Sequence, residues 1–136
     1  MLVGKAIYSI LSNDGAVTTI TTQIASQIED QTENYPQLVY KLEDSPSLQT
    51  YAGPMSLQET KVSIYVMGLS DTDVENLSIA VFDCLSLAPS GTYSAGVAVD
   101  GIYYEGSQDS LEKRPSSQNQ ILYIREMQFR VWYQQT

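Results

Sequence analysis

Residues 57–88, LQETKVSIYVMGLSDTDVENLSIAVFDCLSLA, decide the fold because a period of two gives way there to a helical period. In the first half, Val62, Ile64 and Val66 alternate with more polar residues. Such alternation is typical of a strand that has one face in the core. The sequence therefore predicts a strand over residues 57–67.

A helix is predicted directly after that strand. Gly68 ends the strand, and Ser70 or Thr72 can cap a helix, with an acidic residue three positions further on completing a capping box. Pro89 and Gly91 end this helix. Its buried stripe is predicted to contain Val74, Leu77, Val81, Cys84, Leu85 and Ala88, widened by Ile79 and Phe82.

The N-terminal region has a weaker pattern. Apolar residues at helical spacing predict a first helix over residues 2–12, ended by Asn-Asp-Gly at 13–15. Residues 16–22 stay open between a short helix and an extended segment, since their four threonines lower the helix propensity. Residues 23–28 alternate as in a short strand, and the polar residues 29–34 indicate a loop.

Two further features precede the strand 57–67. Pro36 favours an extended backbone, and the alternating apolar residues that follow predict a strand over residues 37–43. Residues 44–55 form a long connection with Ser-Pro and Gly-Pro turn signals. Loops of this length are often functional, which makes Tyr51 and Met55 candidate contact residues.

The C-terminal third is predicted to be mostly extended. Residues 97–104 read as a strand, and their Asp100-Gly101 pair fits either a tight reversal or a bulge within a single strand. A polar link over residues 106–119 then leads to a long strand over residues 120–134. On this last strand Met127, Phe129, Val131 and Tyr133 share one face, while the apolar run Ile121, Leu122, Tyr123 and Ile124 indicates that both faces are covered there.

This order of elements predicts an α+β fold. We expect a mainly antiparallel sheet with two principal helices packed on one face. At 136 residues the chain is expected to be a single domain, residues 1–136, with enough apolar content for its own core.

The composition removes most catalytic chemistry. The chain has no histidine and one cysteine, so it has no Ser-His or Cys-His relay, no imidazole metal ligand and no internal disulfide. Cys84 lies on the apolar face of the predicted helix and is assigned to the core, and Asp71 and Asp73 are assigned to its first turn. We therefore predict no catalytic residue, no cofactor and no metal site, and expect that the protein is not an enzyme.

The charge also limits the possible partners. A net charge of −9, with 16 Asp and Glu against 7 Lys and Arg, opposes specific nucleic-acid binding and anionic membranes. Residues 1–11 lack the cleavage site of a signal peptide, and no stretch reaches the roughly 18 apolar residues of a membrane span. We therefore expect that the protein has no membrane partner.

The order of the elements resembles the tail-completion or minor-tail proteins of long-tailed bacteriophages, the group that includes tail terminators. The matching features are the end of the first helix at residues 12–17, the strand with its preceding proline at 35–40, the passage from strand 61–66 into the helix 73–87, and the final strand ending at 130–133. These features are spread over most of the chain.

The resemblance implies a virion structural protein in which six copies form a ring that caps the tail tube and helps to join tail to head. Its partners would be copies of itself, the tail-tube protein and a neck or connector protein, and DNA would pass through the ring. The protein would be made in the host cytoplasm and end in the tail or neck of the virion. The alternatives are a neck or head-tail connector subunit and, from another class, a small intracellular regulatory binding module.

The charge layout fits contact between copies. The net charge is −4 over residues 1–61, −8 over 62–112 and +3 over 113–136, which together give the −9 of the whole chain. A basic end and an acidic middle can meet head to tail. We therefore expect Arg125 and Arg130 near a subunit interface opposite acids, or else as solvated charges on strand faces. The candidate subunit or tube contacts are Tyr51, Met55, Asp71, Asp73, Tyr103, Tyr104, Glu105, Asp109, Arg125, Arg130 and Trp132.

Overall fold

A computed structural model describes residues 2–21, 24–26, 36–43, 49–50, 53–54, 57–86, 91–93, 97–113 and 121–135. Its helices are α1 (Leu2–Ser12), α2 (Gly15–Ile20) and α3 (Asp71–Ser86). Its strands are β1 (Ile24–Ser26), β2 (Gln37–Glu43), β3 (Gln49–Thr50), β4 (Gly53–Pro54), β5 (Leu57–Gly68), β6 (Gly91–Tyr93), β7 (Val97–Lys113) and β8 (Ile121–Gln135).

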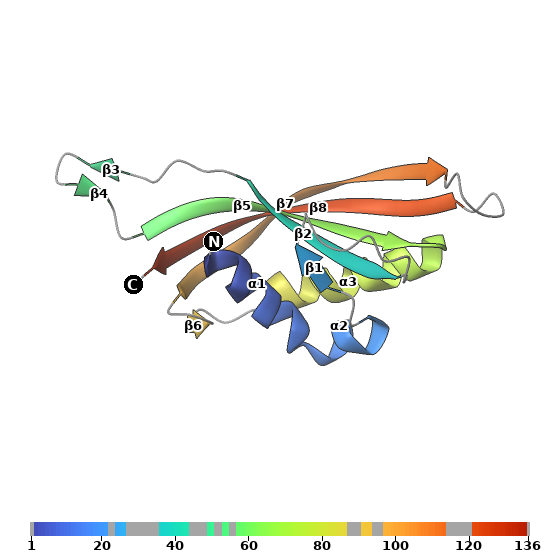
Figure 1. The fold of residues 1–136 in the computed structure, drawn as a ribbon, viewed down its shortest axis with the longest axis horizontal. Coiled ribbons are helices and arrows are strands. Elements are labelled where there is room, and N and C mark those ends of the chain that lie inside the picture. The colour runs from blue at the N-terminus through green and yellow to red at the C-terminus, as the bar shows by residue number, and fades with distance from the viewer. Residues whose placement is uncertain are drawn as a thin grey trace.

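One twisted sheet and a layer of helices form the body of the molecule. The strands lie in the order β1-β2-β5-β8-β7-β6, and every neighbouring pair is antiparallel except β1 with β2. Figure 1 shows α1, α2 and α3 on one side of this sheet, and the small β3–β4 pair beyond its end. The predicted α+β fold, a mainly antiparallel sheet with helices on one face, is confirmed.

The core lies between the helices and one face of the sheet. In the antiparallel register, Val62 of β5 is opposite Phe129 of β8, and Ile64 is opposite Met127, so the two predicted faces meet. These four side chains are at most 3% exposed. The sheet also contributes Leu38, Val66, Val99, Val131 and Tyr133. The helices contribute chiefly Ile7, Leu11, Val17, Leu77, Val81 and Leu85.

After the first helix, the sequence does not decide between a short helix and an extended segment, and the structure shows the helix α2 there. Asp14 caps this helix, because its Oδ1 accepts hydrogen bonds from the backbone N–H of Ala16 at 2.8 Å and of Val17 at 3.1 Å. The cap and the burial of Val17 outweigh the low propensity of the threonines. In α1, Gly4 lies close to β2, and a Cβ there would lie 3.2 Å from Leu42 Cδ1, so the leucine side chain would have to shift by a few tenths of an ångström.

The helix α3 begins where the sequence indicates, and Ser70 is the cap, accepting a hydrogen bond from the Asp73 N–H at 3.1 Å. The predicted stripe is buried at each of its described positions, Cys84 included. The prediction that Ile79 and Phe82 widen it was wrong, since these side chains are 53% and 39% exposed. They lie on the flank of the helix, beyond the arc that the sheet covers.

The largest error concerns β7. Residues 106–113 are not a polar link but continue the strand, and the Asp100-Gly101 pair is a bulge within it. A second bulge follows between Tyr104 and Gly106, where Gly106 has a φ of 141°. The run was misread because its residues are polar, whereas the pairing with β8 holds them extended along the whole strand.

The start of β8 is also less covered than predicted. Leu122 is buried on one face and Tyr123 packs against the core on the other, but Ile121 is 43% exposed, so the cover stops short of the first residue of the strand. The long connection 44–55 contains the short paired strands β3 and β4. The predicted loop at 29–34 lies outside the described residues. Among the helices that the structure describes, none has the length and apolarity to cross a bilayer.

Candidate assembly surface

A groove runs between α3 and β7 on the helix side of the sheet. Two adjoining pockets make it up, with volumes of about 380 Å³ and about 250 Å³, and Arg125 of β8 lines both. The floor also includes Tyr123 and Met127 of β8. We call this feature, lined by α3, β7 and β8, the α3–β7 groove.

The groove carries an unusual amount of exposed apolar surface. Ile79 and Phe82 line it from α3, and Tyr104 from β7. The Phe82 and Tyr104 rings pack edge to face, with their centroids 5.1 Å apart. At the other end Leu111 is 65% exposed. Exposed apolar side chains gathered in one hollow mark an interaction surface more often than a structural one.

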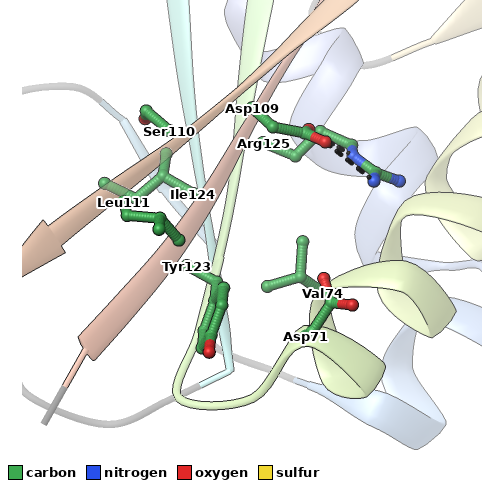
Figure 2. Close-up of a pocket in the computed structure, with 8 residues that line it drawn as sticks. All are labelled: Asp71, Val74, Asp109, Ser110, Leu111, Tyr123, Ile124 and Arg125. Carbon is green, nitrogen blue, oxygen red and sulfur yellow. Dashed lines mark hydrogen bonds and ion pairs between the residues drawn. The ribbon is translucent and has the colours of Figure 1, made fainter.

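Arg125 divides the two pockets and is bound on both sides. Its Nε donates to Asp109 Oδ1 at 2.7 Å and its Nη2 to Asp109 Oδ2 at 3.2 Å, which is a two-pronged pair with β7. Its Nη1 lies 3.0 Å from Glu75 Oε2 on α3. Figure 2 shows the Arg125–Asp109 pair at one side of the larger pocket, with Asp71 and Val74 reaching it from α3. The triad ties α3 to β7 across the groove.

The ion pair between Arg125 and Asp109 shifts the pKa values of both side chains. The hydrogen bond from Arg125 lowers the pKa of Asp109 below its usual 3.8, and the same bond, followed by that to Glu75, raises the pKa of Arg125. Asp109 is 66% exposed, so this pair stabilises the fold only modestly.

We expect the stability of the fold to fall in acid partly through Asp109. Its lowered pKa means that the stabilisation is present above about pH 4 and is lost as the pH falls through the folded-state pKa. The Asp109→Asn variant should be less stable than wild type by under about 1 kcal/mol at pH 7 and equal to it near pH 2. Urea unfolding at several pH values measures this.

Asp100→Asn is the matched control for that measurement. Asp100 is an exposed acid of the same strand and makes no ion pair with any described residue. This variant should stay parallel to wild type across the pH range. A wild type and an Asp109→Asn variant with the same pH profile would contradict the role of the triad.

The opposite face of the sheet carries a second ion group around Arg130. Its Nη2 lies 2.8 Å from Glu105 Oε2, and its Nε lies 3.0 Å from Glu59 Oε1 without hydrogen-bond geometry. No described helix covers this face (Figure 1), which also carries Trp132, half-buried, and Tyr103, 59% exposed. We call it the open face.

The structure thus places the predicted contact residues on two different surfaces. Tyr104, Asp109, Arg125 and Asp71 belong to the groove, and Tyr103, Glu105, Arg130 and Trp132 to the open face. Asp73 is exposed in the first turn of α3, while Tyr51 and Met55 lie outside the described residues. Both arginines have their acidic partners within the chain, so their predicted role between subunits stays a prediction.

The roles of three residues in or beside the groove were not predicted from the sequence. Glu75 was not considered as a partner of Arg125, and Ile79 and Phe82 were counted as core. A helical-wheel projection of α3 could have revealed the two apolar residues, because they lie outside the arc of about 100° that a sheet covers.

Nothing in the described residues resembles a reactive centre. Cys84 is buried with its Sγ 3.5 Å from the Ile10 carbonyl, and burial, with a smaller effect of Asp14, raises the pKa of its thiol to about 12. Such a thiol is neutral at ordinary pH and unreactive. The described part of the chain also holds no group of three or more residues suited to bind a metal.

Comparison with known proteins identifies the fold. No protein-family model matches the sequence, and no curated protein matches it. Among solved structures, the chain is similar to one described as "Virion of native gene transfer agent (GTA) particle", with a TM-score of 0.65 and 14% sequence identity. The match covers 98% of this chain and 97% of the other. The chain therefore shares the whole fold of a chain of that virion.

Proposed function

We propose that the protein is a non-enzymatic virion structural protein, and that it forms a homomeric ring that ends the tail tube of a long-tailed phage particle. The observation that carries the proposal is the fold shared with a gene transfer agent virion chain over nearly the full length of both. The order of elements that resembles tail terminators supports the same role. The proposed ring has six copies and contacts the tail-tube protein on one side and a neck or connector protein on the other.

The surface of the molecule supports a role in assembly. A chain that acts alone rarely leaves a hollow with Ile79, Phe82 and Leu111 exposed, whereas a subunit of a ring buries such surface against its neighbour. Residues 62–112 carry no Lys or Arg, so DNA passing through the ring would meet little that holds it.

Electron microscopy of particles made without the protein tests the proposal. We expect overlong tail tubes when the gene is deleted from the genome that encodes it, and tubes of uniform length when the wild-type gene is supplied in trans. Tubes of normal length that are not joined to heads would instead indicate a connector subunit. Complete, normal particles without the protein would overturn the proposal and favour the regulatory binding module.

A further inference from the structure

The outer edge of β7 is free along most of the strand. β8 pairs with β7 over its whole length, but on the other side β6 pairs only with residues 97–99. No other described strand adjoins β7, and Figure 1 shows its second half at the margin of the sheet. Every residue from Tyr103 to Leu111 is exposed except Gly106, which is half-buried. Since every second residue of an antiparallel pair turns its backbone N–H and C=O away from its partner strand, this edge presents a row of such groups.

This edge lacks most of the features that protect an edge strand. Natural proteins usually block a free edge with proline, lysine, a bulge or a covering element. Both bulges of β7 lie before Ser107, and residues 107–113 pair with β8 without interruption. This stretch has no proline, and its one lysine, Lys113, is its last residue. The edge can therefore accept a further strand.

An added strand would meet a defined set of side chains on the helix side of the sheet. Four residues of β7 line the α3–β7 groove on this side: Tyr104, Ser107, Asp109 and Leu111. Directly opposite residues of neighbouring strands have Cβ atoms about 5 Å apart, so alternate residues of the added strand would contact these four. Close to Tyr104 they would also meet the exposed apolar side chains of Ile79 and Phe82, and at the other end Leu111 is 65% exposed. Apolar residues therefore suit both ends of the added strand.

Between these apolar ends the groove suits a basic residue. On the helix side, Asp71, Glu75 and Asp109 face one cation, Arg125, which leaves a net charge of −2. The Asp109 side chain is 66% exposed, and Arg125 occupies only two of the roughly four acceptor positions of its carboxylate. The two residues that end β7, at 112 and 113, have opposite charges and leave the balance unchanged. A lysine or arginine opposite Asp109 would form a favourable cross-strand pair.

We propose that the free edge of β7 binds an extended segment of another protein as an added strand, with a basic residue opposite Asp109 and apolar residues two positions to either side of it. A second copy has no free segment of this kind. In the whole sequence, a basic residue has hydrophobic neighbours two positions away on both sides only at Lys5 and Arg125. Lys5 lies within α1, and Arg125 lies in β8, which is paired on both sides. That the segment belongs to another protein of the virion rests on the proposed function.

Hydrogen exchange of the wild-type protein tests the added strand without any variant. In the dilute isolated protein, the amides over residues 107–111 that point away from β8 should exchange fast, because no described strand pairs with them. In purified particles the same amides should exchange at least about tenfold more slowly, because they then donate to the added strand. Unchanged exchange in particles overturns the proposal. Slowing that appears in the isolated protein as its concentration is raised also overturns it, because the partner is then a second copy.

Two variants at Ser107 test the charge of the partner. Ser107 is exposed, lines the groove and lies two residues before Asp109, so a new charge there is next to the predicted basic residue. In particles that lack the wild-type protein, Ser107→Lys should give a yield at least about tenfold lower than Ser107→Asp, because only the lysine repels that residue. Equal yields, or a lower yield for Ser107→Asp, overturn the proposal.

Asn76→Lys is the matched control for Ser107→Lys. It adds the same charge to an exposed position of α3 that lines neither pocket, so its particle yield should equal that of wild type.

Particles made without the protein separate this inference from the proposed function. Complete, normal particles in its absence reject the proposed function. Overlong tubes in its absence, together with fast exchange over residues 107–111 in wild-type particles, reject the added strand alone.

Discussion

Replacing Phe129 with alanine is expected to remove about 3–5 kcal/mol from the free energy of unfolding. Phe129 is fully buried in the middle of β8, opposite Val62 of β5, and its ring lies 5.4 Å from that of Tyr104. Its loss opens a cavity at the point where β5, β8 and α3 meet. Since small proteins have total stabilities of about 5–15 kcal/mol, the variant should be close to unfolding. Urea unfolding followed by circular dichroism measures the change.

The control for this prediction is Ile121→Ala on the same strand. Ile121 is 43% exposed, so its truncation leaves no cavity and should cost less than about 1 kcal/mol. A loss below about 1 kcal/mol for Phe129→Ala would mean that the sheet and helices do not pack as described.

Replacing Phe82 with aspartate is expected to leave the fold nearly intact and to abolish assembly. Phe82 is 39% exposed in the α3–β7 groove, so the variant loses mainly the ring contact with Tyr104, worth about 1 kcal/mol. In an assembled ring the same position would place a charge in a buried apolar contact. A central contact residue contributes about 2 kcal/mol or more, so particle yield should fall at least about 30-fold.

Asn76→Asp is the matched control for Phe82→Asp. It adds the same carboxylate to an exposed position of α3 that lines neither of the two pockets. Its particle yield should equal that of wild type, as counted in electron micrographs with wild-type complementation as reference. An assembling Phe82→Asp variant would show that the groove stays open in the particle.

The elements that the sequence predicts well are those whose own residues determine their environment. In β5, Val62 and Ile64 alternate strictly with more polar residues, and in α3 the stripe from Val74 to Leu85 repeats at helical spacing. Burial is then decided by local pattern alone. These two elements, with β2, α1 and β8, were predicted with their bounds correct to within about two residues.

The errors occur where a distant neighbour decides the structure. The polar end of β7 is extended because β8 pairs with it, and no short window of its own sequence contains that information. Likewise, Arg125 forms ion pairs with Asp109 on the neighbouring strand β7 and with Glu75 on α3, about fifty residues earlier in the chain. Exposure of Ile79 and Phe82 depends on how far the sheet extends beneath α3.

The two bulges of β7 control the phase of its side chains. Between Val99 and Gly101, and again between Tyr104 and Gly106, one extra residue reverses the alternation, so the second bulge undoes the inversion made by the first. Val99 and Asp109 consequently face the same side although an inverted segment lies between them. Loss of the extra residue at either bulge, Asp100 or Glu105, would convert the bulge into regular pairing and leave Asp109 opposite Arg125 and Leu111 opposite Tyr123, so the groove would keep its lining. The two bulges are therefore the positions of this strand at which a single-residue deletion should leave the groove intact.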